Sequence, residues 1–140
     1  MRFFKGYAKD CKKKPGRIIL VIISKHADII SENKRPDDII IQDGVYYAIS
    51  QLIEGEPRHY DTDDIRIKTF EICLNKLKEL LKDTDIKEIA IQHWAGSYTN
   101  DQWINRKNML KEFEKNGYEI SVYVPVDNTK KSDDDIDLKN

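Results

Sequence analysis

Apolar residues recur along the chain in two different patterns. Residues 17–24, RIILVIIS, form a continuous and mostly β-branched run, which is typical of a strand covered on both faces of a sheet. Residues 63–82 instead place apolar side chains three and four positions apart, which predicts a helix with one buried face. That face would hold Phe70, Cys73, Leu74, Leu77, Leu80 and Leu81. Strand-like and helix-like segments in one chain indicate an α/β fold.

Turn signals place a hairpin in the first half of the chain. Asp43-Gly44 lies between two β-rich runs, residues 39–42 and 45–52. Asp-Gly favours the tight primed turn that joins antiparallel strands. These residues therefore predict a β-hairpin.

A second helix is predicted over residues 100–116, with Trp103, Met109, Leu110 and Phe113 on its inner face. Asn116-Gly117 would end it, because glycine readily takes the left-handed conformation that closes helices. Further strands are predicted at residues 1–7, 86–92 and 118–124, the last with Ile120, Val122 and Val124 facing inward and Ser121 and Tyr123 facing away. The expected fold is a mixed central sheet with both helices packed on it.

Length and composition fit one small domain. The chain has 140 residues, 39% hydrophobic and 35% charged, enough apolar material for a single core. Residues 1–126 are expected to form one α/β domain, and residues 127–140, which mix lysine with aspartate, a disordered tail. The net charge of −1 does not favour a nucleic-acid-coating protein.

The sequence indicates a cytoplasmic protein without a metal or cofactor. The longest apolar run, residues 18–23, is too short to span a bilayer, and the N-terminus has no signal-peptide pattern. Cys11 and Cys73 have no partner at metal-ligand spacing. Asp61, Asp63 and Asp64 cluster before the first helix, where capping and solvent exposure account for them.

The segment 93–101, HWAGSYTND, is the strongest candidate for a ligand site. It follows a predicted strand and leads into a helix N-terminus, where free amides and the helix dipole favour an anion such as phosphate. Small side chains would let a ligand approach the backbone, aromatic ones would stack on a base, Asn100 or Asp101 would bond a ribose, and one arginine would supply charge. The candidate ligand-binding residues are Trp94, Gly96, Ser97, Tyr98, Asn100, Asp101 and Arg106.

A structural interpretation of the same segment stays open. Gly96 can simply make the turn, Thr99 or Asn100 can cap the helix, and both aromatic side chains can pack. His93 has no second histidine or carboxylate at matching spacing, so a structural role is favoured for it. No residue is assigned a catalytic role, and a binding protein is favoured over an enzyme.

The order of elements resembles that of a macrodomain, the fold that binds ADP-ribose. The resemblance covers most of residues 3–124 and is carried by FFKG, RIILVIIS, the hairpin continuing as VYYAIS, TFEICLNKLKELL, KEIAIQ, WINRKNMLKEF and YEISVYV. It is closest to the small single-domain hydrolase branch. Asp10 is the nearest substitute for the family's adenine-reading aspartate. Ile41 or Gln42 stands at the hydrolases' lysine, and Thr99 stands nearest their loop aspartate.

Loss of that catalytic pair implies binding without turnover. The resemblance implies a small nucleotide as partner, of the ADP-ribose type or cyclic. In this respect the chain resembles phage proteins of immune evasion that sequester such nucleotide signals. If the chain were an enzyme, the resemblance implies an ADP-ribosyl hydrolase. A homo-oligomer is left open, since a second subunit can complete a pocket that lacks a wall.

Two alternatives come from other classes. The segment IIIQDG, with Asp43, and Glu71 on the following helix resemble an RNase-H-like nuclease, which holds two divalent ions with carboxylates on adjacent elements. The third carboxylate of such a site would follow IAIQ, where His93-Trp94 stands. The other alternative is a protein-interaction module.

Overall fold

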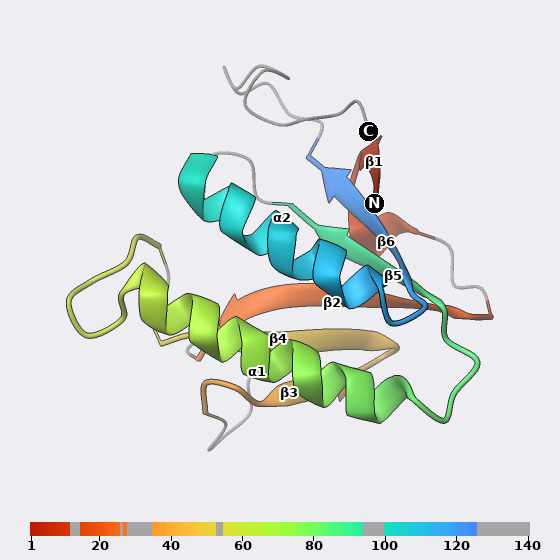
Figure 1. Ribbon diagram of the computed structural model, residues 1–140, viewed down its shortest axis with the longest axis horizontal. Helices are drawn as coiled ribbons and strands as arrows, with labels where there is room; N and C mark the ends of the chain where they lie inside the picture. Colours follow the sequence, from red (N-terminus) through yellow and green to blue (C-terminus); the bar gives the residue numbers. More distant parts are fainter. Residues whose placement is uncertain (12–14, 26, 28–34, 53–54, 94–99, 126–140) are drawn as a thin grey trace. The chain divides into compact units, whose positions relative to one another are not determined.

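The computed structural model describes residues 1–11, 15–25, 27, 35–52, 55–93 and 100–125. Within them it forms a mostly parallel mixed sheet of six strands with two α-helices packed on it (Figure 1), in the strand order β1-β6-β5-β2-β4-β3. The predicted α/β class is therefore confirmed. The strands are β1 Arg2–Lys5, β2 Arg17–Ser24, β3 Ile39–Gln42, β4 Val45–Gln51, β5 Glu88–Gln92 and β6 Glu119–Val124, and the helices are α1 Asp63–Leu81 and α2 Asn100–Glu114. No helix of the described ranges has both the length and the hydropathy that crossing a membrane requires.

The chain divides into two compact units. The first combines Met1–Ile19 with the chain from Asp85 onward, and the second is Leu20–Thr84. Strand β2 contributes its first three residues to the first unit and the others to the second. The limits of the predicted domain, 1–126 with a tail at 127–140, stay a prediction, because residues 126–140 lie outside the described residues.

The first unit contains β1, β6 and β5 as parallel neighbours, with α2 packed on β6. The register places Ser121 of β6 beside Arg2 on one side and Ala90 on the other. Helix α2 contributes its predicted inner face, and Trp103 and Phe113 are both buried.

The side of β6 that was expected to face away from Ile120, Val122 and Val124 is covered at Ser121. Ser121 has 0% exposure. The strand lies between two others, and the Ser121 hydroxyl donates to Glu88 Oε2 of β5 at 3.1 Å. A satisfied hydroxyl can be buried at low cost, so hydrophobic alternation does not report burial on this strand.

The second unit is built on the predicted hairpin. Strands β3 and β4 pair antiparallel, with Gln42 opposite Val45. Asp43 and Gly44 both have positive φ, 54° and 81°, as a primed two-residue turn requires. The hairpin prediction is therefore confirmed.

Helix α1 packs on β4 and β3. The Thr62 hydroxyl caps its N-terminus by accepting from the Ile65 amide at 3.2 Å. Five of the six predicted core side chains are buried, but Leu80 is 47% exposed. Leu80 turns to the flank of the helix beside β3, the last strand of the sheet, so no further described strand covers it.

Candidate functional site

The candidate site lies in the first unit, where β5 ends at Gln92 and α2 begins at Asn100. A parallel strand followed along the chain by a 15-residue helix is the order of elements predicted from the sequence. The intervening residues 94–99 lie outside the described residues, so the positions of four predicted ligand residues are not given: Trp94, Gly96, Ser97 and Tyr98.

The side chain of Gln92 braces this end of the unit. Its Oε1 accepts from the Ala8 amide at 2.8 Å, and its Nε2 donates to the carbonyls of Tyr123 at 3.0 Å and His93 at 3.2 Å. One amide thereby joins β5, β6 and the short 3-10 turn η1, Ala8–Asp10. Gln92 was not among the predicted site residues, although a polar residue at the end of an apolar strand was a signal for it.

The turn η1 carries Asp10, which the resemblance to a macrodomain offered as a substitute for that family's adenine-reading aspartate. Asp10 is exposed, and its amide donates to the Tyr7 carbonyl at 3.0 Å. Tyr7 is 38% exposed, and Lys9 Nζ lies 5.8 Å from the centroid of its ring. An exposed carboxylate, phenol and ammonium therefore gather on a turn that Gln92 holds at the carboxyl end of β5.

His93 lies directly after β5 and is buried, with 5% exposure. Its amide donates to the Tyr123 carbonyl at 2.8 Å. Its ring lies edge-on to the Trp103 ring, with 4.1 Å between the ring centroids. The Trp103 ring in turn lies edge-on to the Phe3 ring, with 6.3 Å between the centroids. The ring contacts agree with the structural role favoured for His93.

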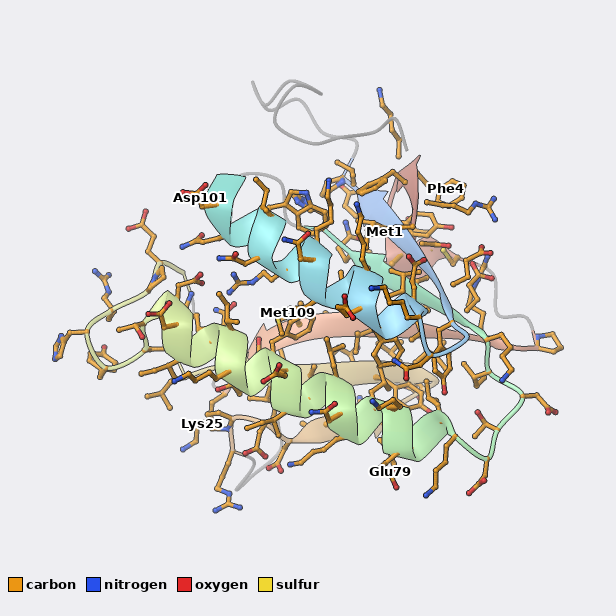
Figure 2. All side chains as sticks on the ribbon, viewed as in Figure 1. Met1, Phe4, Lys25, Glu79, Asp101 and Met109 are labelled. Carbon is orange, nitrogen blue, oxygen red and sulfur yellow. The ribbon has the colours of Figure 1, made fainter. Side chains whose placement is uncertain are left out.

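The start of α2 holds the remaining predicted residues. Asn100 and Asp101 are in the first turn, and the Asp101 side chain is exposed (Figure 2). Arg106 is buried, with 3% exposure, and its Nη1 donates to the Gln102 carbonyl at 3.2 Å. The structure thus places Asp101 at the surface of the helix start and Arg106 within the packed side of the helix.

A polar network ties the opposite, amino end of β5 to its neighbours. Glu88 Oε2 accepts from Arg17 Nη2 at 2.9 Å and from the Ser121 hydroxyl. The hydrogen bond from Glu88 is the largest cause of a raised pKa for Arg17. Burial, followed by a hydrogen bond with Cys11, raises the pKa of Tyr123 to about 12. These groups hold strands together and leave Tyr123 protonated at neutral pH.

The second unit contains the carboxylates of the nuclease alternative and of the acidic cluster before α1. Asp43 occupies the hairpin turn, and Glu71 is exposed on α1. Asp61, predicted to be solvated, is instead 2% exposed. It accepts from Arg66 Nη2 at 2.9 Å and from the Leu52 amide at 3.0 Å. Across the part of the chain that the structure describes, no group of three or more His, Cys, Asp or Glu side chains could hold a metal ion.

The burial of Asp61 follows from its partner. Arg66, also buried at 3% exposure, donates to the carbonyls of Gly55 at 2.8 Å and Glu56 at 3.4 Å. The ion pair thereby fastens the loop before α1 to the helix. A charged residue one turn into the helix was the only sequence signal for it.

Comparisons with known proteins identify a fold and no family. The sequence matches no protein-family model and no curated protein. An X-ray crystal structure of a Northeast Structural Genomics Consortium target from Bacteroides thetaiotaomicron is similar, with a TM-score of 0.66 and 12% identity over 89% of this chain and 99% of that one. A protein of unknown function from Bacteroides thetaiotaomicron is similar with a TM-score of 0.61 and 14% identity, over 88% of this chain and 96% of that one. At these identities the likeness shows a shared small α/β fold with a mixed six-stranded sheet.

Proposed function

We propose that this chain binds an ADP-ribose-type or cyclic nucleotide and holds it without turnover, at the carboxyl end of β5. The observation that carries the proposal is the strand-to-helix connection from Gln92 to Asn100. Carboxyl ends of parallel strands are where α/β proteins bind ligands, and a helix start offers unpaired amides to phosphate.

The braced turn η1 adds support on the same edge. Gln92 holds Ala8–Asp10 at the end of β5, so Asp10 and Tyr7 lie near the strand end from which the chain continues towards α2. A carboxylate can accept from the exocyclic amine of a base, and a phenol ring can stack on it. The order of elements, which resembles a macrodomain, is consistent with these roles.

The roles proposed for residues 94–101 follow from their chemistry. Backbone amides near Gly96, Ser97 and Tyr98 bind the diphosphate, and Trp94 or Tyr98 stacks on the base. Asn100 or Asp101 bonds a ribose hydroxyl, and Arg106 supplies positive charge. By the resemblance to macrodomain hydrolases, Ile41 or Gln42 stands at their catalytic lysine, and Thr99 stands nearest their loop aspartate. None of these three can act as a general acid or base, which favours sequestration of the ligand.

Calorimetry against ADP-ribose, NAD, cyclic ADP-ribose isomers and cyclic oligonucleotides tests binding, and chromatography of the recovered ligand tests turnover. We expect one ligand to bind and to return intact. Gly96→Val should abolish binding, because a branched side chain would stand where the diphosphate approaches the backbone. The free energy of unfolding should change by no more than ~1–2 kcal/mol.

A matched pair of aspartates provides the control. Asp101 and Asp64 both lie exposed in the first turn of a helix, α2 and α1 respectively. Asp101→Ala should weaken binding roughly tenfold, about one lost hydrogen bond, whereas Asp64→Ala should leave it unchanged. If no nucleotide binds the wild type, or if Gly96→Val binds normally, the proposal is wrong.

A further inference from the structure

Basic residues are concentrated in residues 1–17 of the chain. This segment, MRFFKGYAKDCKKKPGR, contains seven lysine and arginine residues and a single acidic residue. Since the whole chain has 24 basic and 25 acidic residues, the remainder holds 17 basic and 24 acidic ones. The net charge is therefore +6 in residues 1–17 and −7 in residues 18–140. Such an asymmetry indicates a negatively charged partner for the basic segment, although the net charge of the whole chain conceals it.

Aromatic side chains alternate with the basic ones on β1. Phe3 has its ring edge-on to Trp103 of α2, so it faces the helix. Phe4, labelled on β1 in Figure 2, faces the opposite side of the sheet, because successive side chains of a strand alternate. Its ring stacks on that of Tyr123, its register partner on β6, with 5.1 Å between the centroids, and both rings are half-buried. The guanidinium carbon of Arg2 lies 5.1 Å from the centroid of Phe4. Arg2, Phe4 and Tyr123 thus form an aromatic face on the side of the first unit away from α2.

The turn η1 brings a further basic side chain to the aromatic face. Gln92 pairs with Tyr123 in the parallel register of β5 and β6, so both side chains lie on the same face of the sheet. Because Gln92 Oε1 accepts from the Ala8 amide at 2.8 Å, η1 lies over this face. Its exposed Lys9 therefore adds positive charge on the same side of the unit as the two rings.

Two carboxylates neutralise part of the positive charge. Arg17 pairs with Glu88 at 2.9 Å, and with side-chain exposures of 15% and 17% this pair holds strands together. Arg2 pairs with Glu119 at 2.8 Å, but these side chains are 61% and 49% exposed. Exposed pairs of this kind contribute little, so a phosphate can compete for Arg2. With both pairs counted, residues 1–17 keep an excess of four positive charges.

We propose that the aromatic face binds single-stranded nucleic acid. The basic side chains bind phosphates, and unpaired bases stack on the planar groups of Arg2 and Phe4; positive charge combined with aromatic rings is the chemistry that binds single strands. A duplex fits this face poorly, because its grooves admit a helix or a two-stranded ribbon and its paired bases are not available for stacking. The face is separate from the proposed nucleotide site, which uses neither Arg2 nor Phe4.

Fluorescence anisotropy of a labelled oligouridylate, titrated with the full chain over a range of salt concentrations, tests the proposal. An oligonucleotide of about 15 residues covers the known range of site sizes. We expect a micromolar dissociation constant at low salt. Each phosphate contact to a single strand contributes about −0.7 to the slope of log affinity against log salt. With Arg2, Lys5 and Lys9 as contacts, the slope should be about −2 or steeper.

Two variants separate stacking from charge. Phe4→Leu keeps an apolar side chain on β1 and should raise the dissociation constant roughly tenfold, because one base loses its stacking partner. The double variant Arg2→Gln/Lys9→Gln changes only exposed side chains, so it tests the proposal even if Phe4→Leu fails to fold. It should weaken binding and reduce the salt slope by about 1.4. Lys111→Gln is the matched control, because Lys111 is exposed on α2, on the other side of β6, and it should bind as the wild type does.

The Gly96→Val variant should also bind the oligonucleotide as the wild type does, which separates this face from the nucleotide site. An oligouridylate that does not bind at low salt contradicts the proposal, as does an Arg2→Gln/Lys9→Gln variant with unchanged affinity. A Lys111→Gln variant weakened as much as that double variant contradicts it too. A duplex bound as tightly as the single strand, or phosphatidylserine vesicles bound in its place, would show attraction to anions in general and overturn the assignment.

Discussion

At the scale of single residues, the expectation from the sequence and the structure differ most at Asp61. The sequence placed it among acidic residues at a helix start, where solvent and capping were sufficient explanations. The structure buries it against Arg66 and the Leu52 amide. Thr62 alone provides the side-chain cap at Ile65. A buried carboxylate with a buried guanidinium costs little only while both are present.

Removing one member of this pair should therefore be costly. Asp61→Ala leaves the Arg66 charge buried and uncompensated, and should lower the free energy of unfolding by ~3–5 kcal/mol. Urea denaturation followed by circular dichroism measures this loss. Asp64→Ala, at an exposed position of the same helix turn, should cost less than ~0.5 kcal/mol.

The double variant Asp61→Leu/Arg66→Leu gives a second check. It removes both charges together, so it should be more stable than Asp61→Ala. Equal urea midpoints for the wild type and Asp61→Ala would show that the ion pair has no role in stability.

At the scale of elements, local signals were sufficient for the hairpin and for both helices. The Asp43-Gly44 turn has the two positive φ values that its sequence predicts. Helix α1 is capped by Thr62, and the chain after α2 turns at Gly117 with φ of 95°. Each of these signals acts over a few residues and does not depend on the remainder of the fold.

Substitutions at Gly44 test whether the local sequence sets the conformation of the hairpin turn. Gly44→Ala adds a Cβ at φ 81° and should lower the free energy of unfolding by ~1–2 kcal/mol, the cost of left-handed backbone for an alanine. Gly44→Asn should cost less, because asparagine tolerates that conformation. Thermal denaturation measures the stability of both variants. An alanine variant as stable as the wild type would show that the turn changes conformation to accommodate the added Cβ.

At the scale of the whole molecule, the core controls how stability depends on pH. Burial raises the pKa of Cys73 to about 12 from an ordinary value of 9.0. The pKa of Tyr123, which is half-buried and hydrogen-bonded to Cys11, is raised to about 12 from 10.0. The folded state therefore binds both protons more tightly than the unfolded state does.

This difference predicts a loss of stability in alkali. Below about pH 9 both groups are protonated whether the chain is folded or not, so their contribution is fully present. Between about pH 9 and pH 12 the unfolded chain loses these protons first, so the free energy of unfolding falls as the pH rises. Urea midpoints measured across this range should decrease steadily, and less steeply in Cys73→Ala. A Cys73→Ala slope equal to that of the wild type would contradict the assignment to Cys73.

The sequence predicted the strand and the helix that flank the proposed site, but not the contacts that support the end of that strand. The strand-to-helix connection after β5 follows from periodicity, and Asp101 lies at the helix start as expected. Gln92 was missed because its partner, the Ala8 amide, is 84 positions away, and no local pattern reports such a contact. Arg106 is buried, which its spacing on the helix did not reveal, and its role as a charged ligand contact stays a prediction.

By itself the sequence determined the α/β class, the hairpin, the glycine turn after α2 and most of the buried face of each helix. Periodicity and turn chemistry are local, so they act on any chain with these residues. Only the tertiary structure decided the strand order, the burial of Ser121 between two strands, the ion pair of Asp61 with Arg66, and the exposure of Leu80 beside the last strand. Each of these depends on which element lies alongside, and that is set by packing between residues far apart in the chain.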